Sequence, residues 1–146
     1  MVDSPDRLKK LPKKKKMGVV AQTTQSFDNL KAIVNECLGK TGELRVFNTI
    51  CGATAIRQDQ SSDIAKEVDC MIIVGGYSSA NTNRLAEICK VIQPNTHHIE
   101  VAGELVPVWF RGVKRVGVTA GASTPEWVID EVLERIRSFE NKADSM

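Results

Sequence analysis

The sequence has 146 residues, of which 42% are hydrophobic and 26% charged, a composition typical of one globular domain or two small ones. Its net charge of +2 is too mild to indicate a nucleic-acid partner. It contains no apolar stretch long enough to span a bilayer and no hydrophobic segment of a signal peptide near residue 1. We therefore expect a protein of the cytoplasm, or of an organelle stroma after removal of a leader, with no membrane partner.

The positive charge is concentrated at the start of the chain. The first sixteen residues hold seven basic and two acidic side chains, a net charge of +5, and the remaining residues sum to −3. Most of this charge lies in the run Lys13–Lys16. Such a run is most often a solvated linker, and a contact with nucleic acid, a membrane or a partner protein is the less favoured alternative.

Strand and helix patterns alternate along the chain. Ser4-Pro5-Asp6 predicts the start of a short helix that ends near Leu11, and an apolar segment follows at 17–21. Strands are then predicted at 44–47, 70–74, 96–101 and 115–119, and helices at 26–38, 53–68, 83–92 and from 124 onward, with 104–110 uncertain. This alternation predicts an α/β fold with parallel strands. The run 70–74 is apolar throughout, as expected for a strand buried on both faces.

Four loops between a predicted strand and the next helix combine hydroxyl or amide side chains with Gly or Ala. In α/β sheets, ligands bind beyond the carboxyl ends of the strands, and the free N–H groups of helix starts favour anions. Several such loops together would form a phosphate site. The same residue types are also the preferred caps of any helix, so spacing alone does not decide between the two interpretations. The loops are 22–24, 48–54, 78–83 and 121–124.

The four cysteines divide into one functional candidate and three core candidates. Cys51 follows a predicted strand at the start of a helix, a position that favours the thiolate and suits a metal ligand or a nucleophile. Cys37 and Cys89 lie on apolar helix stripes, and Cys70 lies in the apolar strand. We expect these three to pack as small hydrophobic side chains.

The loops together resemble the sequence blocks of one enzyme family. Asn48-Thr49-Ile50-Cys51, with Ala53-Thr54 and Arg57-Gln58, resembles the third cysteine motif of the 4-hydroxy-3-methylbut-2-enyl diphosphate (HMBPP) reductases. These enzymes catalyse the last step of the non-mevalonate isoprenoid pathway. Blocks similar to others of the family occur in the same order at 21–24, 75–76, 79–85 and 117–125. The sequence is thereby identified as the C-terminal half of a family member.

The resemblance implies a fold of three parallel-sheet α/β lobes around a 4Fe-4S cluster, with the substrate diphosphate between lobes. Residues 1–43 would belong to the second lobe, 44–124 would form the third, and 125–146 would be the C-terminal helix and tail. The implied reaction removes the hydroxyl of HMBPP reductively and yields isopentenyl and dimethylallyl diphosphates. An electron donor such as ferredoxin or flavodoxin is implied as a partner.

The matching motifs also imply roles for individual residues. Cys51 would bind iron, as the single cluster ligand of this sequence. Thr23 would lie near the departing hydroxyl of the substrate, and Thr54 would line the same cavity. The side chains that would hold the diphosphate are those of Ser79, Asn81 and Ser123.

The departures from the family concern activity. The family has its other two cluster cysteines, its phosphate-binding histidines and its glutamate proton donor in an N-terminal half, which the 146 residues do not match. Because such clusters are held by several thiolates, we expect the isolated chain neither to retain a cluster nor to reduce the substrate. Two alternatives remain open: a cluster-free module that binds a phosphorylated small molecule, and one half of a split enzyme. Exposed apolar surface is expected in the partial second lobe.

Overall fold

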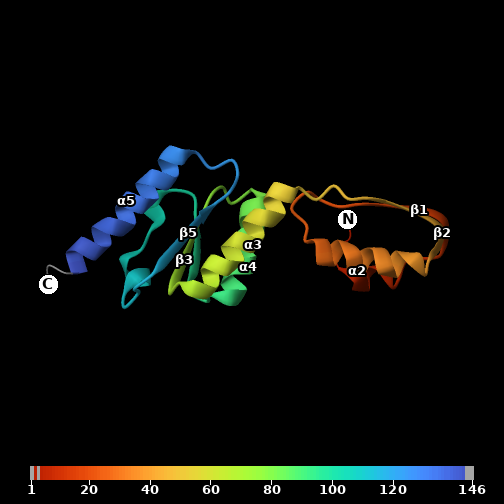
Figure 1. The fold of residues 1–146 in the computed structure, drawn as a ribbon, viewed down its shortest axis with the longest axis horizontal. Helices are drawn as coiled ribbons and strands as arrows, with labels where there is room; N and C mark the ends of the chain where they lie inside the picture. Colours follow the sequence, from red (N-terminus) through yellow and green to blue (C-terminus); the bar gives the residue numbers. More distant parts are fainter. Residues whose placement is uncertain (1, 3, 144–146) are drawn as a thin grey trace. The chain divides into compact units, whose positions relative to one another are not determined.

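A computed structural model describes residue 2 and residues 4–143, which fall into two compact units, residues 1–55 (unit 1) and 56–146 (unit 2). The elements are α1 (Pro5–Leu8), β1 (Lys14–Val20), α2 (Phe27–Leu38), β2 (Thr41–Phe47), α3 (Gly52–Glu67), β3 (Cys70–Val74), α4 (Ala80–Ile92), β4 (Thr96–Ile99), the 3₁₀ turns η1 (Ala102–Glu104) and η2 (Pro107–Phe110), β5 (Val116–Ala120) and α5 (Glu126–Ala143) (Figure 1). All paired strands are parallel, which confirms the α/β prediction. Within the described ranges, no helix is both long and apolar enough to cross a membrane.

Unit 1 contains a two-stranded sheet with α2 on one face (Figure 1). Ser26 caps α2 as its hydroxyl oxygen accepts a hydrogen bond from the Asn29 N–H at 3.2 Å, and Gly39 follows the last turn. Both helix boundaries were predicted from these residue types. The core of the unit is small, and its members come from both helices and both strands: Leu8, Ile33 and Cys37, contacted by Val2, Met17, Val19 and Leu44.

The lysine run forms part of β1 and is not a linker, so this prediction was wrong. Lys14 to Lys16 pair with the start of β2, in the register Lys16 with Glu43. The composition of the run does not show this pairing, which involves residues far along the chain. The lysines are nevertheless solvent-exposed, as the linker prediction also implied.

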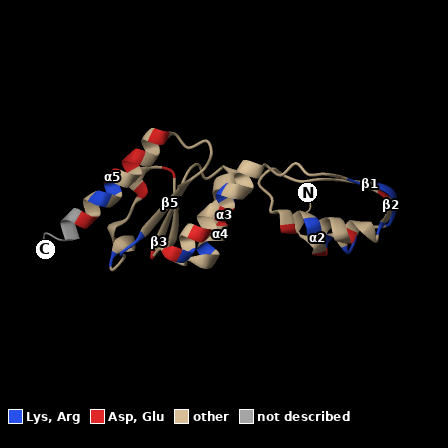
Figure 2. Cartoon of the chain, viewed as in Figure 1, with Lys and Arg blue, Asp and Glu red and all other residues tan. Residues whose placement is uncertain are grey.

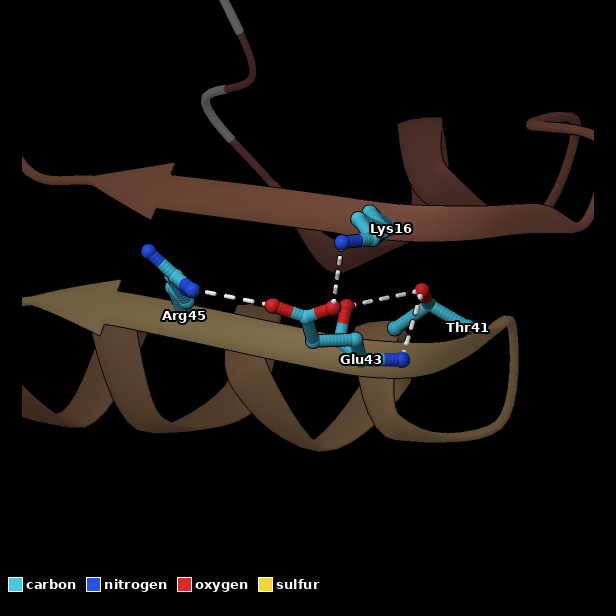
Figure 3. Close-up of polar contacts among 4 residues, drawn as sticks. All are labelled: Lys16, Thr41, Glu43 and Arg45. Carbon is cyan, nitrogen blue, oxygen red and sulfur yellow. Dashed lines mark hydrogen bonds and ion pairs between the residues drawn. The ribbon is translucent and has the colours of Figure 1, made fainter.

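The second face of the β1–β2 sheet is uncovered. Because Met17 and Val19 contact the α2 side, the alternating side chains Lys16 and Val20 lie on the opposite face. Figure 3 shows the Glu43 carboxylate on this sheet, with Lys16 Nζ at 3.0 Å and Arg45 Nε at 3.2 Å. Among the described residues of unit 1, no helix packs over these charges (Figure 2).

Unit 2 contains a three-stranded sheet in the order β4-β3-β5, covered on both faces. All five side chains of β3 are completely buried, which confirms the prediction for 70–74. Alternate β3 residues pack on opposite sides: Cys70, Ile72 and Val74 with Val128, Val132 and Ile136 of α5, and Met71 and Ile73 with Ala65 of α3 and Leu85 and Cys89 of α4.

The compact units divide at 55/56, whereas the predicted lobes divide at 43/44 and 124/125. β2 pairs with β1 inside unit 1, and α5 packs inside unit 2. The assignment of these segments to lobes of the family fold stays a prediction. Residues 144–146 of the predicted C-terminal tail lie outside the described part of the chain.

Candidate functional site

The loops that follow β1 and β2 are joined to each other in unit 1. The Thr49 hydroxyl donates a hydrogen bond to the Ala21 carbonyl, and the Cys51 N–H donates to the Thr23 carbonyl at 3.0 Å. Parallel strands end at the same edge of a sheet, which is why residues 28 positions apart in sequence meet here. The structure therefore brings together Thr23 and Cys51, two site residues predicted from separate loops.

Cys51 directly precedes α3 and is exposed to solvent. Its carbonyl accepts the hydrogen bond of the Ala55 N–H at 3.0 Å, the first bond of the helix. Thr54 lies in this first turn and is half-buried. The predicted position of Cys51, at a helix N-terminus where a thiolate is favoured, is confirmed.

The other three cysteines are core residues, as predicted. Cys37 is 4% exposed, and Cys70 and Cys89 are completely buried. Burial raises the pKa of the Cys37 thiol and raises the pKa of both Cys70 and Cys89 to about 11, so these thiols stay protonated at neutral pH. Within residues 2 and 4–143, no group of three or more His, Cys, Asp or Glu side chains is placed to hold a metal ion. The donor set described here therefore does not fit a four-iron cluster by itself.

The loops that follow β3 and β5 meet in unit 2. The Thr124 hydroxyl donates to the Val74 carbonyl at 3.0 Å and so ties the second loop to the end of the central strand. Gly75 has a φ of +150°, and a Cβ there would lie 2.8 Å from Thr82 Oγ1 and 2.9 Å from Thr124 Oγ1. Only glycine fits at this position, where the backbone passes close to both threonine side chains. The loop of Ser123, whose side chain is exposed, thus adjoins the start of α4.

Ser79 and Asn81, predicted to bind the diphosphate, lie at the N-terminus of α4. The Ser79 hydroxyl oxygen accepts a hydrogen bond from the Thr82 N–H at 3.3 Å, which makes Ser79 the cap and starts the helix at Ala80 and not at the predicted Asn83. The Asn83 amide instead donates to the Tyr77 carbonyl at 2.8 Å. Ser79 therefore has the structural role of a cap, while its O–H remains a donor.

Asn81 differs from these neighbours because its amide has no structural use in unit 2. Both Nδ2 and Oδ1 are buried, and neither has a hydrogen-bond partner in the described part of the chain. An unsatisfied buried polar group costs about 1–3 kcal/mol, and native proteins keep few of them. Next to a helix N-terminus, such an amide is the clearest sign of a polar ligand in this unit.

Four residues that hold the Ser79 loop were not predicted from the sequence. The Tyr77 hydroxyl donates to Glu104 Oε1 at 2.7 Å, and the Tyr77 N–H donates to Glu100 Oε1 at 2.7 Å. His98 Nε2 donates to the Gly75 carbonyl at 2.8 Å. The hydrogen bond with Glu104 raises the pKa of Tyr77 to about 12, and the same bond lowers the pKa of Glu104. No local pattern could reveal this set, because its members are 21 to 27 residues apart.

A cavity of about 420 Å³ opens in unit 2 beside the end of β5. It is lined by Arg57 and Ser61 of α3 and by Thr119 and Gly121, with a hydrogen bond of 2.9 Å between the Ser61 and Thr119 hydroxyls. Arg57 supplies a positive charge next to the Gly121–Thr124 loop. The surroundings of this loop therefore offer hydroxyls, backbone groups and one cation, a combination that favours a phosphate.

The fold and these loops define the chain as a parallel α/β protein whose polar groups gather at the carboxyl ends of its strands. A model of the LytB protein family matches residues 1–137. The chain belongs to the LytB family, as the resemblance of its loops predicted.

Similar proteins identify the same family. The HMBPP reductase of Geobacter sulfurreducens is 64% identical over 142 residues, which are 97% of this chain and 50% of that protein. The HMBPP reductase of Pelobacter propionicus is 61% identical and is covered to 51%. A solved HMBPP reductase, described as the terminal enzyme of the non-mevalonate pathway, is 51% identical, with a TM-score of 0.61 over 91% of this chain and 46% of that one. The Plasmodium falciparum reductase superposes with a TM-score of 0.78 at 28% identity, over 91% of this chain and 43% of that one. The chain thus spans about half the length of the curated relatives it matches, which is consistent with a C-terminal half.

Proposed function

We propose that this chain supplies the substrate-binding loops and one cluster ligand of an HMBPP reductase, and that catalysis requires the part of the relatives' length that it does not span. The reaction would convert HMBPP to isopentenyl and dimethylallyl diphosphates, with electrons from a donor such as ferredoxin or flavodoxin. The observation that carries the proposal is the unpartnered, buried Asn81 amide at the start of α4, in a chain 64% identical to such a reductase.

In this proposal the two units contribute different groups. Unit 1 contributes Cys51 as a single iron ligand and Thr23 near the departing hydroxyl, and the hydrogen bond from Cys51 to Thr23 supports their acting together. Thr54, in the first turn of α3, is proposed to line the cavity that holds this part of the substrate. The diphosphate is held in unit 2 by Asn81, by the O–H of Ser79 and by Ser123.

The cluster itself supplies electrons to the substrate when it is bound, and it needs further ligands from outside the described residues. The three core cysteines do not serve, since they are buried and protonated. We also propose a cytoplasmic location, supported by the absence of any disulfide among the four cysteines.

The test compares the chain alone with the chain co-expressed with the N-terminal half of the Geobacter sulfurreducens reductase. Both samples are reconstituted anaerobically with iron and sulfide, and iron content, visible absorbance and HMBPP reduction are measured. We expect a four-iron cluster and turnover only in the co-expressed sample, with both lost in Cys51→Ala. A stable four-iron cluster and turnover in the chain alone would contradict the proposal.

The second candidate is a cluster-free module that binds a phosphorylated small molecule. The Asn81 amide and the Arg57 cavity favour it, since neither observation involves iron. Calorimetry with inorganic diphosphate, in the absence of iron, separates the two functions. Binding by the isolated chain that is lost in Asn81→Ala or Ser123→Ala, and is unchanged in Cys51→Ala, together with no reduction in any sample, would favour the module.

A further inference from the structure

The loop that joins β3 to α4, residues 75–79, is held by side chains from one neighbouring segment of unit 2. β3 and β4 are parallel and end at the same edge of the sheet, with Val74 opposite Ile99 and the Gly75 N–H donating to the Ile99 carbonyl at 2.9 Å. The residues at and after the end of β4 therefore lie beside this loop. Those whose side chains bond to it are His98, Glu100 and Glu104.

Tyr77 is the residue through which most of these bonds reach the loop. Its N–H donates to Glu100 Oε1 at 2.7 Å, its hydroxyl donates to Glu104 Oε1 at 2.7 Å, and its carbonyl accepts from the Asn83 amide at 2.8 Å. Its ring also contacts that of His98, with the centroids 4.8 Å apart. All three polar groups of Tyr77 thus have protein partners, although the residue is 48% exposed and water could satisfy them. Such bonding fixes the position of a loop residue.

The carboxylate of Glu104 is itself held in place. Its Oε2 accepts hydrogen bonds from the Glu100 N–H at 2.6 Å and the Val101 N–H at 3.1 Å, at the start of η1. The hydrogen bond from Tyr77, followed by those from the two N–H groups, lowers the pKa of Glu104, so this side chain stays ionised at neutral pH. A negative charge at this edge of the sheet would repel a diphosphate, so the use of Glu104 here lies in its hold on Tyr77.

The loop that Tyr77 holds leads directly into the proposed diphosphate ligands. The Ser79 N–H donates to the Gly76 carbonyl at 3.0 Å, the Ser79 hydroxyl caps α4, and the unpartnered Asn81 amide follows in the first turn of the helix. A shift of residues 75–79 would therefore move Ser79 and disturb the turn that contains Asn81. A ligand binds more tightly when the groups that contact it are ordered before it arrives, because binding then does not have to order them.

We propose that Tyr77 and Glu104 are positioning residues for the diphosphate: their hydrogen bond holds the 75–79 loop in the conformation that presents Ser79 and Asn81, and neither side chain contacts the substrate. The inference rests on the proposed function, since it takes Ser79 and Asn81 as the ligands. Loss of the Tyr77–Glu104 bond weakens the binding of the diphosphate. It leaves the reduction step unchanged, because the loop contributes no group to the departing hydroxyl.

The test measures KM and kcat for HMBPP in the chain co-expressed with the N-terminal half of the Geobacter sulfurreducens reductase and reconstituted with iron and sulfide. Tyr77→Phe removes only the hydroxyl, and Glu104→Ala removes its acceptor. We expect each variant to raise KM about tenfold with kcat unchanged. The double variant should be no worse than Glu104→Ala alone, because both changes remove the same hydrogen bond.

Two further variants separate positioning from charge and from general damage. Glu104→Gln keeps an oxygen for the two N–H groups and gains an amide that donates to the Tyr77 hydroxyl oxygen, so its KM should stay closer to the parent than that of Glu104→Ala. Ser138→Ala is the matched control, since it removes one hydroxyl hydrogen bond, of 2.7 Å to the Arg135 carbonyl of α5, elsewhere in unit 2. It should leave KM unchanged.

Hydrogen exchange of the chain alone gives a second measurement, which needs no cluster. Tyr77→Phe should speed the exchange of the amides of residues 77–83 several-fold and leave those of β3 unchanged, since the loop opens without unfolding the sheet. Ser138→Ala should change neither set of amides.

Three results would overturn the inference: loop exchange that Tyr77→Phe does not speed, a KM that stays at the parent value, or a loss confined to kcat. An effect of Tyr77→Phe on KM that persists in the Glu104→Ala background would also overturn it, because the hydroxyl would then act on the substrate directly.

A failure of the proposed function is distinguishable from these results. If no sample reduces HMBPP, inorganic diphosphate is titrated into the same proteins by calorimetry. Weaker binding by Tyr77→Phe than by the parent would support the positioning role without catalysis. Equal binding by the two proteins, or no binding by either, would overturn the inference as well.

Discussion

The two units are built from the same parallel strand–helix pattern, but only unit 2 closes its core. In unit 2 the central strand β3 is completely buried between α5 on one side and α3 and α4 on the other. Among the described residues of unit 1, β1 has one neighbouring strand and one covered face. An open groove of about 550 Å³ is lined there by residues of β1, of α2 and around α1. The difference shows that a closed core depends on how many strands and helices pack together, and not only on the pattern within each of them.

Deletion of a core side chain should show the difference between the units most strongly. Ile72 of β3 is completely buried, and Ile72→Ala should lower the free energy of unfolding of unit 2 by about 2–5 kcal/mol. Ile33→Ala, beside the groove in unit 1, should cost less than about 2 kcal/mol, because the hollow already exists and water reaches it. Native-state hydrogen exchange, which resolves each unit, measures both values. Equal losses would show that unit 1 is as well packed as unit 2.

Glycine substitutions in the sheets provide a second comparison. A Cβ on Gly117 of β5 would lie 2.6 Å from Met71 Sδ and 2.7 Å from Ile64 Cγ2, so Gly117→Ala should destabilise unit 2 by about 1–3 kcal/mol through overpacking. A Cβ on Gly18 of β1 would meet nothing within 4 Å. Gly18→Ala should therefore leave stability unchanged or raise it slightly. Urea unfolding of the two variants tests this, and a larger loss in Gly18→Ala would refute the contrast.

The fold was largely predictable from the sequence wherever one segment contains its own signal. The apolar run of β3, the Ser26 cap and the Gly39 stop all gave correct elements. β1 was missed in its lysine half, because the pairing of Lys16 with Glu43 that makes it a strand is not visible in either segment. The start of α4 was placed three residues late, since the sequence offers several polar residues that could cap it.

The candidate site was predictable as a set of loops, but not in its connections. The position of Cys51 before α3 followed from the alternation of strands and helices. Its hydrogen bond to Thr23 depends on the parallel pairing of β1 and β2, and the unpartnered Asn81 amide depends on three-dimensional packing. The hydrogen bonds of Tyr77 with Glu100 and Glu104 were missed for the same reason. The roles of the individual site residues stay predictions.

Thiol reactivity should give a third and smaller contrast. Cys51 should react with a thiol reagent at once at pH 8, as it is exposed. Cys37 should react next, through opening of unit 1, and Cys70 and Cys89 only on unfolding of unit 2. Mass spectrometry of samples quenched over time follows this order. Labelling of Cys70 before Cys37 would reverse the proposed order of stability.

The same thiols predict an alkaline limit for unit 2. Burial raises the pKa of Cys70 and Cys89 from 9.0 to about 11, so the folded unit keeps them neutral while the unfolded chain ionises them. The stability that this provides is fully present below pH 9 and is lost as the pH rises towards 11. Unfolding of unit 2 measured between pH 8 and 11 should show the loss, and Cys89→Ala should reduce it. A pH-independent stability over this range would contradict the prediction.

The smallest effects should come from exposed ion pairs. Glu43→Gln removes the contacts with Lys16 and Arg45 in unit 1, and Asp63→Asn removes the 3.0 Å pair with Lys66 in unit 2. Each change should cost less than about 1 kcal/mol and less still in high salt. Thermal unfolding at two salt concentrations measures both. A large loss of stability for Glu43→Gln alone would mean that charge, and not packing, causes the difference in stability between the two units.

A partner that fills the open groove would make the stability of unit 1 depend on the concentration of that partner. A partner that binds only the folded form stabilises it by about 2.7 kcal/mol when present at a hundred times its dissociation constant. In a cell, the folded fraction of unit 1, and with it the resistance of this unit to proteases, would therefore follow the supply of such a partner. The abundance of the chain would then report the abundance of its partner, even where its own synthesis is constant.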